Sequence, residues 1–174
     1  MSKSPSVFDY EKLLWFNGEY IRRLPEDKYL ALAEPYLPEL PAHINRRRLL
    51  ALLSGRIQCF SEIPERIGFF LALPDYTAEL FPNKKNKVTP ENAPALLSLA
   101  REALGEVTVW DNDTLFATLS EKAQAAEVKA GALFWCIRIA VSGQAVTPGG
   151  ATELMEVLGR EESLSRLDAA IAKF

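Results

Sequence analysis

The apolar positions of this chain recur at spacings of three and four residues along most of its length, which is the period of an amphipathic helix. In 44–57, for example, Leu49, Leu53 and Ile57 fall on one stripe of such a helix. Alternating apolar and polar runs of the kind that mark strands are weak, and no hairpin dipeptide separates two of them. The pattern therefore predicts an all-α fold. The predicted helices cover 12–24, 26–37, 44–57, 61–73, a segment that starts at 90, 114–127, 129–141, 151–160 and 161–174.

Residues with side-chain oxygens mark the start of several predicted helices. Ser61 is the predicted N-cap of the fourth helix, because a proline follows inside the first turn. Thr89 is the predicted N-cap of the next helix, which begins with a proline. Either Asp111 or Asp113 caps the helix after that. The segment 129–141 is apolar enough for a core helix, although its valine and isoleucines also suit a strand.

Two segments interrupt the helical pattern. Proline, asparagine and aspartate punctuate 73–90, which is predicted to be a linker. The shorter segment 142–150 ends in a Pro-Gly-Gly sequence and is predicted to be a loop between two helices. No internal repeat or low-complexity stretch accompanies these breaks. The expected units are a leading helix in 1–24, one helical subdomain in 25–88 and a second helical subdomain in 89–174.

Composition is that of an ordinary soluble domain, with 48 % hydrophobic and 25 % charged residues. The net charge is −3, but the first 60 residues hold nine basic and seven acidic side chains, whereas the other 114 hold eleven and sixteen. This balance argues against a wholly basic DNA binder and leaves room for a local basic face. No apolar run approaches the roughly 18 residues of a membrane span, and no signal segment follows Lys3. With two cysteines in no metal or disulfide pattern, we expect a cytoplasmic protein that binds neither DNA nor membranes.

Motifs that carry catalysis or bind metals and nucleotides are missing from the sequence. The single histidine, His43, has no partners at the spacing of a catalytic triad or a metal site, and a helix-start or surface role explains it as well. Neither the P-loop pattern nor the dinucleotide-binding glycine pattern occurs. We therefore expect no catalytic residue and no metal site in this chain.

Several blocks of the sequence carry a resemblance to a known family. They include SKSPSVFDYEKLLWFNGEYIR, SGRIQCFSEIPERIGFFLALPDYTAELFPNKKNK and EVKAGALFWCIRIAVSGQAVTPGGATELMEVLGREESLSRLDAAI. In the same order, these blocks resemble the part of bacterial glutamyl-tRNA synthetases that follows the catalytic half. The resemblance covers nearly the whole chain and is weakest over 97–116, where only the helical pattern agrees. It implies an all-α anticodon-binding cage in two helical subdomains, with 1–24 at the end of a stem-contacting region.

The first residues also match most of KMSKS, a motif that grips ATP in class I aminoacyl-tRNA synthetases. Ser2, Lys3 and Ser4 carry this match. In that fold a HIGH-like signature precedes KMSKS, whereas here the comparable letters around His43 follow it. The parallel sheet that builds the phosphate site is also not predicted. The resemblance instead puts these three residues just after the catalytic half, so that the ATP, glutamate and magnesium sites would lie upstream.

Anticodon bases are unstacked and are read on their edges and by stacking, so a reader needs arginine forks, close backbone groups and apolar platforms. The resemblance implies that Arg56 reads the last anticodon base and that Arg138 contacts the anticodon. It also implies that Thr147 and Pro148 contact the first two bases. Gly149, in the same loop, would leave backbone N–H groups accessible near a helix N-terminus. As patterns alone, these residues have plainer explanations: an exposed arginine, an ion pair or an ordinary turn.

Other basic residues are candidates for phosphate contacts, which position an RNA without reading its sequence. They cluster at the start of the predicted helix 44–57 and in the linker, and simple solvation explains each cluster equally well. Trp15 and Tyr20 are left out of the site, because their spacing is more typical of core packing than of base stacking. The candidates are Arg46, Arg47, Arg48, Lys84, Lys85 and Lys87.

The resulting hypothesis is recognition of the anticodon of tRNA(Glu), with Arg56 favouring an anticodon that ends in C. The parent reaction would be the ATP-dependent ligation of glutamate to tRNA. This chain alone would be a non-catalytic monomer that binds neither ATP nor magnesium. Two alternatives stay open: a stand-alone helical module, derived from the synthetase, that binds another protein, and a complete small enzyme. Met1 is either native or an added start.

Overall fold

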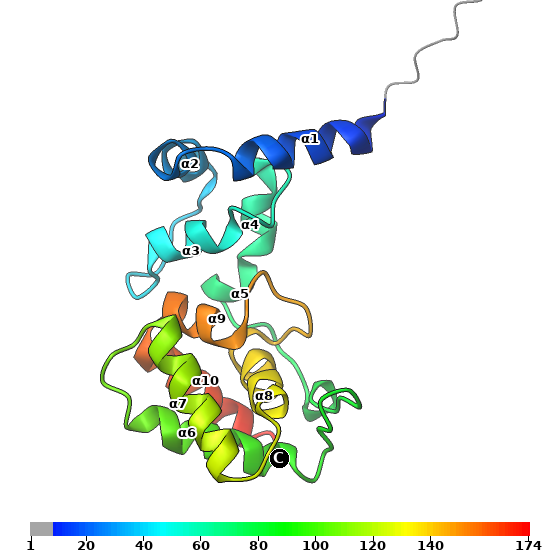
Figure 1. Ribbon diagram of the computed structural model, residues 1–174, viewed down its shortest axis with the longest axis vertical. Helices are drawn as coiled ribbons and strands as arrows, with labels where there is room; N and C mark the ends of the chain where they lie inside the picture. Colours follow the sequence, from blue (N-terminus) through cyan, green and yellow to red (C-terminus); the bar gives the residue numbers. More distant parts are fainter. Residues whose placement is uncertain (1–8) are drawn as a thin grey trace, which may run out of the picture.

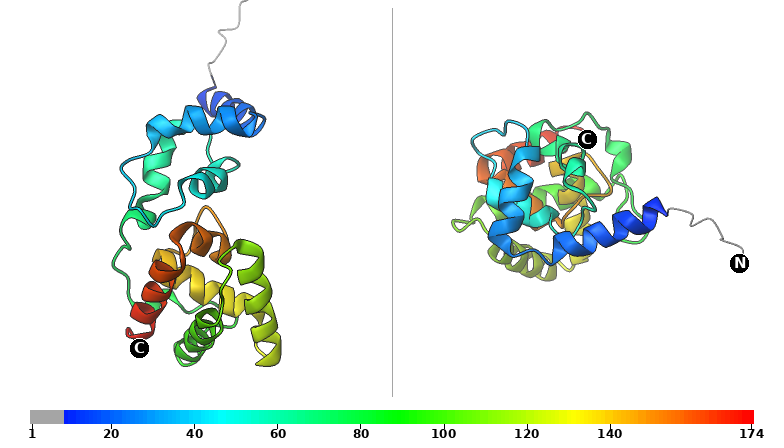
Figure 2. Two further views of the ribbon diagram at one scale, coloured as in Figure 1. Left: turned by 90° about the vertical axis from the view of Figure 1, so that its left-hand side faces the viewer. Right: turned by 90° about the horizontal axis from the view of Figure 1, so that it is seen from above.

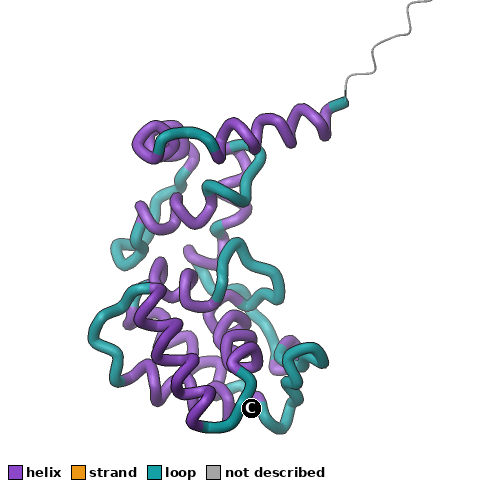
Figure 3. Tube along the Cα trace, viewed as in Figure 1, coloured by secondary structure: helices purple, strands orange, loops and turns teal. Residues whose placement is uncertain are grey.

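Residues 9–174 are described by the structure, a computed structural model, and they form helices joined by loops (Figures 1 and 3). Within this range no strand occurs, and the one ladder-like contact is an isolated bridge between Asn83 and Val88. The predicted all-α fold is therefore confirmed, whereas Ser2, Lys3 and Ser4 lie outside the described residues. The α-helices are α1 (Tyr10–Arg22), α2 (Glu26–Ala33), α3 (Arg46–Leu53), α4 (Ile63–Arg66), α5 (Gly68–Leu71), α6 (Ala93–Gly105), α7 (Asn112–Ala125), α8 (Ala130–Ser142), α9 (Ala151–Leu158) and α10 (Arg160–Ile171). Three short 3₁₀ turns are η1 (Glu34–Tyr36), η2 (Phe60–Glu62) and η3 (Ala78–Leu80).

The helices form two parts that are stacked along the long axis of the molecule (Figure 1). Helices α1–α5 make the N-terminal part and α6–α10 the C-terminal part, and the side view in Figure 2 shows the same division. One continuous cluster of buried apolar side chains nevertheless runs through both parts, and α3 packs on α9 across them. The predicted unit boundaries after 24 and after 88 stay predictions. No helix in 9–174 is long and apolar enough to cross a membrane.

Helix α8 forms the centre of the C-terminal part, where it contacts α6, α7, α9 and α10. Leu133, Cys136 and Ile137 are fully buried, and burial raises the pKa of the Cys136 thiol to about 12. This segment is therefore a core helix, as predicted, and the strand alternative is excluded. The helix ends at Gly143, whose φ of +64° is a conformation that suits glycine.

Arg166 of α10 ties three helices together from a position that is only 4 % exposed. Its Nη1 donates to the carbonyl oxygens of Phe69 and Val141, both at 2.7 Å. Its Nε donates to the Glu162 carboxylate, also at 2.7 Å. Because Phe69 lies in α5 and Val141 in α8, one guanidinium joins the two parts of the molecule. No sequence pattern singled this residue out.

Two aromatic side chains of α1 face solvent, since Trp15 is 52 % exposed and Tyr20 71 % exposed. The expectation that their spacing reflects core packing is therefore wrong. Helix α1 packs by its other side, where Gly18 and Ile21 are buried. A Cβ at Gly18 would lie 3.4 Å from the Cα of Gln58, in ordinary van der Waals contact, so this side of α1 lies against the backbone at Gln58. The amphipathic spacing identified the helix but not the side that it buries.

The segment predicted as one helix over 61–73 consists of the η2 turn followed by the short helices α4 and α5. The Glu62 carboxylate accepts hydrogen bonds from the backbone N–H groups of Gln58 and Cys59, at 2.8 and 3.0 Å. The turn therefore begins after Cys59, and Ser61 lies inside it. The prediction of Ser61 as an N-cap is wrong, because a carboxylate one residue later already satisfies these donors.

The other two predicted caps have different outcomes. Helix α6 begins at Ala93, so the prediction that Thr89 caps a helix starting at the next residue is wrong. The Thr89 N–H instead donates to Asn92 Oδ1 at 2.9 Å, which forms a turn before the helix. For α7, the prediction of an aspartate cap is confirmed, since Asp111 Oδ1 accepts from the Thr114 N–H at 2.8 Å.

Candidate nucleic-acid interface

A cavity of about 540 Å³ opens between the two parts of the molecule and is lined by three of the predicted site residues. Arg56 reaches it from the turn after α3, and Thr147 and Pro148 reach it from the loop between α8 and α9. The fold thus brings together residues that are far apart in the sequence. We call this cavity the central pocket. Its other lining residues are Glu62, Glu65, Arg66, Gln144 and Val146.

The Arg56 side chain is 42 % exposed and is anchored at one end. Its Nη1 donates to the carbonyl oxygen of Leu52, in the preceding turn of the chain, at 2.8 Å. Its Nη2 lies 3.8 Å from Glu153 Oε2 of α9, which is too long for a hydrogen bond. The guanidinium therefore keeps donors that a ligand in the central pocket can use.

The loop before α9 is held by short contacts of its own. The Thr147 hydroxyl donates to the Gly149 carbonyl at 2.7 Å, which leaves its oxygen lone pairs available. A Cβ at Gly149 would lie 2.6 Å from Leu52 Cδ1, so glycine lets the loop pack closely on α3. The Gly150 N–H already donates to Glu153 Oε2 at 2.7 Å. Close packing thus explains the glycine at 149, and the predicted role of accessible N–H groups there stays a prediction.

Arg138 does not join the residues that line the central pocket. It is half-buried on α8, and its Nε is buried with no hydrogen-bond partner among the described residues. Leaving such a donor unpaired costs about 1–3 kcal/mol. The main chain at this position is engaged, since its carbonyl accepts the Ser142 hydroxyl at 2.6 Å. The anticodon contact of Arg138 stays a prediction.

The three arginines at the start of α3, which are candidates for phosphate contacts, each pair with a carboxylate. These ion pairs are partly exposed, and exposed pairs contribute only about 0–1 kcal/mol each. An RNA phosphate could therefore displace such a carboxylate at small cost. The pairs are Arg46–Glu34 at 2.6 Å, Arg47–Glu26 at 2.8 Å and Arg48–Glu156 at 3.1 Å.

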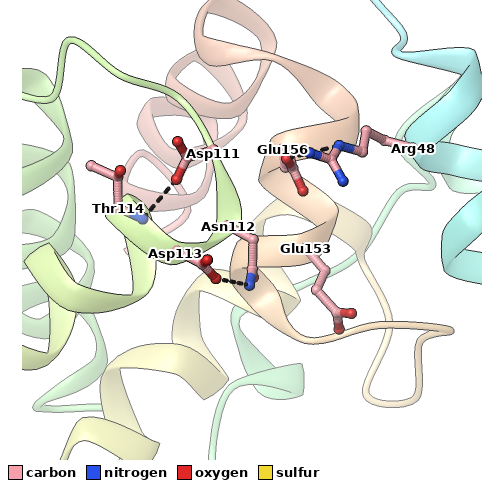
Figure 4. Close-up of a pocket in the computed structure, with 7 residues that line it drawn as sticks. All are labelled: Arg48, Asp111, Asn112, Asp113, Thr114, Glu153 and Glu156. Atoms are coloured by element: carbon pink, nitrogen blue, oxygen red, sulfur yellow. Dashed lines mark hydrogen bonds and ion pairs between the residues drawn. The ribbon is translucent and has the colours of Figure 1, made fainter.

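Acidic side chains surround Arg48 in a second cavity, of about 470 Å³ (Figure 4). The Thr114 backbone N–H lowers the pKa of Asp111, which keeps this carboxylate charged. A phosphate at Arg48 would meet these negative charges, so the surroundings disfavour the predicted phosphate contact at this one residue. In 9–174 no group of three or more His, Cys, Asp or Glu side chains has an arrangement that could hold a metal ion. The cavity is lined by Arg48, Asp111, Asn112, Asp113, Thr114, Glu153 and Glu156.

The linker lysines Lys84, Lys85 and Lys87 are exposed on a tight turn that the Asn83–Val88 bridge closes. The turn is fixed by the Asn83 side chain, which accepts the N–H of Asn86 at 2.9 Å. None of the three lysines belongs to the ion pairs formed within 9–174. Their charges are therefore available to an anionic partner.

Glu62 gives the central pocket a charged acceptor beside its arginines. Burial tends to raise the pKa of Glu62, but hydrogen bonds from Arg66 and from the backbone N–H groups of Gln58 and Cys59 outweigh it and lower the pKa. The Arg66 Nη2 lies 2.7 Å from the carboxylate. The pocket therefore presents both positive and negative groups, unlike a simple phosphate site.

Sequence reasoning missed Glu153, which contacts both Arg56 and the loop before α9. Its spacing from Gly150 is that of a capping box, in which the third helical residue bonds back to the N-cap. That spacing was the available signal. The contact with Arg56 could not be seen in the sequence, because it depends on how α9 packs on α3.

Unstacked bases are read by hydrogen bonds on their edges and by stacking, and the central pocket offers arginine donors and carboxylate acceptors for such bonds. The sequence model described as "Anticodon binding domain" matches residues 28–171, and the chain therefore belongs to the anticodon-binding domain family.

Relatives agree with the resemblance seen in the sequence. The glutamate–tRNA ligase of Clostridium novyi (strain NT) is 40 % identical over 178 residues, which cover 99 % of this chain and 37 % of the relative. That of Clostridium tetani (strain Massachusetts / E88) is 39 % identical over 174 residues, 99 % of this chain and 36 % of the relative. The chain thus spans just over a third of the length of these ligases.

Solved structures of two glutamate–tRNA ligases share the fold. The protein from Elizabethkingia meningosepticum CCUG26117, in complex with its amino acid, superimposes with a TM-score of 0.79 at 22 % identity, over 95 % of this chain and 32 % of that chain. The protein from Elizabethkingia anophelis gives a TM-score of 0.76 at 21 % identity over the same shares. The helical architecture described above is therefore one that glutamate–tRNA ligases contain.

Proposed function

We propose that this chain recognises the anticodon of the glutamate tRNA as one part of a longer glutamate–tRNA ligase. The ATP- and magnesium-dependent ligation of glutamate would take place in the remainder of that protein. This chain would contribute no catalytic residue and would bind no ATP, glutamate or magnesium itself. We further propose that it is monomeric, cytoplasmic, and does not bind DNA or membranes. Family membership and the identity to glutamate–tRNA ligases support this proposal.

The central pocket is the observation that carries the proposal. An unstacked base presents donors and acceptors on its edge and apolar faces above and below. In the pocket Arg56 supplies donors, and Thr147 offers a hydroxyl oxygen. Pro148, with the 85 % exposed Val146 beside it, provides apolar surface against which a base can lie. A pocket with this mixture suits a base better than a phosphate.

We assign the last anticodon base to Arg56 and the first two to Thr147, Pro148 and Gly149. A planar arginine fork reads two acceptors on one base edge, and such a pair is worth about 1–3 kcal/mol of discrimination. We expect cytosine to be favoured at the last position. Arg138, with its unpaired Nε, is the fifth proposed anticodon contact.

The phosphate contacts would come from the lysines of the linker turn and from the arginines at the start of α3. Of these, Lys84, Lys85 and Lys87 are the stronger candidates, because their charges are unpaired within the described residues. Arg48 is the weakest, since carboxylates surround it. These contacts would orient the tRNA without reading its sequence.

The test is binding of an anticodon stem-loop of the glutamate tRNA, measured against the same stem-loop with an unrelated anticodon. We expect wild-type protein to prefer the glutamate anticodon and Arg56→Ala to weaken that preference by about 5- to 150-fold. Arg101→Ala is the matched control, because it removes the same charge from an arginine that pairs with Asp168. Equal binding of both stem-loops by the wild-type protein would contradict the proposal.

A further inference from the structure

Glu153 lies between Arg56 of the N-terminal part and the loop before α9 of the C-terminal part. It is not one of the residues that line the central pocket. It is the third residue of α9. Its Oε2 accepts the Gly150 N–H at 2.7 Å and lies 3.8 Å from Arg56 Nη2. The same oxygen would be 3.2 Å from a Cβ at Gly149. One carboxylate thus touches the loop before α9 and attracts the arginine from the N-terminal part.

The two contacts of Glu153 differ in kind. The bond to Gly150 has the length of a charge-assisted hydrogen bond and fixes the carboxylate in place. The approach to Arg56 is too long for a hydrogen bond, so it attracts the guanidinium without using its donors. Nη1 of Arg56 is anchored on the Leu52 carbonyl. The attraction of Nη2 to Glu153 therefore sets the direction of the guanidinium fork.

The neighbouring carboxylate of α9 has a separate partner. Figure 4 shows Glu153 and Glu156 on the same helix, α9. Glu156 is paired to Arg48, and the Glu153 side chain points away from that pair. The two residues therefore act on different arginines of the N-terminal part. This makes Glu156 a matched control, because its removal changes the net charge by the same amount.

We infer that Glu153 is a positioning residue for base recognition, which orients the Arg56 fork toward the loop that carries Thr147 and Pro148. The inference rests on the proposed function and deepens it. Orientation before binding improves discrimination, because less ordering is needed when the base arrives. Glu153 does this through its charge, while its hydrogen bond to Gly150 keeps that charge at a fixed place.

The deciding variant is Glu153→Gln, since glutamine can still accept from the Gly150 N–H but carries no charge. The measurement compares two stem-loops, one whose anticodon ends in G and one whose anticodon ends in C. The quantity is the dissociation constant of the G-ending stem-loop divided by that of the C-ending one. We expect Glu153→Gln to lower this ratio at least threefold, out of the about 5- to 150-fold that an oriented fork supplies. Glu156→Gln is expected to leave the ratio within twofold of wild type. Thermal unfolding of both variants checks that each is folded.

A second comparison shows whether Glu153 acts through Arg56. In an Arg56→Ala background, adding Glu153→Gln is expected to leave the ratio unchanged, because the group that it orients is gone. A ratio that Glu153→Gln leaves at the wild-type value overturns the inference, as does an equal loss in both backgrounds. A wild-type protein that binds the glutamate anticodon and an unrelated anticodon equally overturns the proposed function, and this inference with it. A wild-type protein that prefers the glutamate anticodon but does not distinguish the C-ending from the G-ending stem-loop overturns the assignment of the last base to Arg56, and with it this inference. Wild-type discrimination that Glu153→Gln leaves undiminished overturns the inference alone.

Discussion

Single carboxylates hold the central pocket together as much as its arginines do. Glu62 bonds to two backbone N–H groups and to Arg66 at the rim of the pocket. Glu153 bonds to the loop before α9 and attracts Arg56. Each carboxylate satisfies donors at the end of a turn or helix, which would otherwise lack partners. The positions of the groups that we propose recognise bases therefore depend on residues that need not touch RNA.

The role of Glu62 predicts how stability depends on pH. Because its folded pKa is lowered from the ordinary value of 4.5, the unfolded chain takes up the proton first. The stabilisation is therefore fully present above pH 4.5 and is lost as the pH falls through the lower folded pKa. We expect Glu62→Gln to cost about 1 kcal/mol near neutral pH, through weaker hydrogen bonds. The difference from wild type should shrink as the pH falls below 4.5.

Urea unfolding of wild type and Glu62→Gln between pH 7 and pH 3 measures this difference. Glu65→Gln is the control, because that carboxylate lines the same pocket but is exposed. Its stability difference from wild type at neutral pH should be small. A constant difference between Glu62→Gln and wild type over the whole range would contradict the prediction.

Individual site residues differ in how far the sequence could identify them. Arg56, Thr147 and Pro148 were proposed from a resemblance, and the fold does bring these three to one cavity. The reason for Gly149 was not visible, because its contact with Leu52 joins residues that are distant in the chain. The local signal at Asp111 identified a helix cap, whereas those at Ser61 and Thr89 did not. Contacts between the two parts need the tertiary structure.

At the scale of helices, the three- and four-residue spacing predicted the elements well but not their environment. The stripe of α3 is buried as expected, with Leu49 and Leu53 at 0 % exposure. In α1, Leu13, Phe16 and Tyr20 recur at the same three- and four-residue spacing, yet all three are exposed. An apolar stripe shows that a helix has one apolar side, but what covers that side depends on the rest of the assembly. Periodicity alone therefore could not separate a core face from an open one.

The packing of α10 predicts a large effect from one buried side chain. Arg166→Met removes the donors that satisfy the carbonyls of Phe69 and Val141. These buried oxygens would be left unpaired, and we expect a loss of about 3 kcal/mol in the free energy of unfolding. Urea unfolding measures the loss.

Arg101→Met is the comparison for Arg166→Met, because it removes an arginine that pairs with Asp168 on the same helix α10. Asp168 is exposed, so this variant should lose at most about 1 kcal/mol. Equal losses in the two variants would show that the buried bonds of Arg166 add no more to the free energy of unfolding than an exposed ion pair does.

For the whole molecule, base reading and phosphate contact are assigned to different places. The central pocket lies between the two parts, whereas the three unpaired lysines lie on the linker turn that leads from α5 toward α6. A net charge of −3 gives little general attraction to RNA. The local basic turn would therefore supply much of the salt-dependent affinity, and the pocket the sequence preference.

This division predicts that two variants change different properties of stem-loop binding, one its salt dependence and the other its anticodon preference. Replacing Lys84, Lys85 and Lys87 together by alanine should reduce the slope of log affinity against log salt by about 2, at about 0.7 for each lost phosphate contact. The preference for the glutamate anticodon should remain. Arg56→Ala should lower that preference and leave the slope close to that of wild type. Titrations at several salt concentrations measure both quantities for each protein. An unchanged slope in the lysine variant would show that the linker turn is not part of the interface. A much reduced slope in Arg56→Ala would show that Arg56 contacts a phosphate and does not read a base.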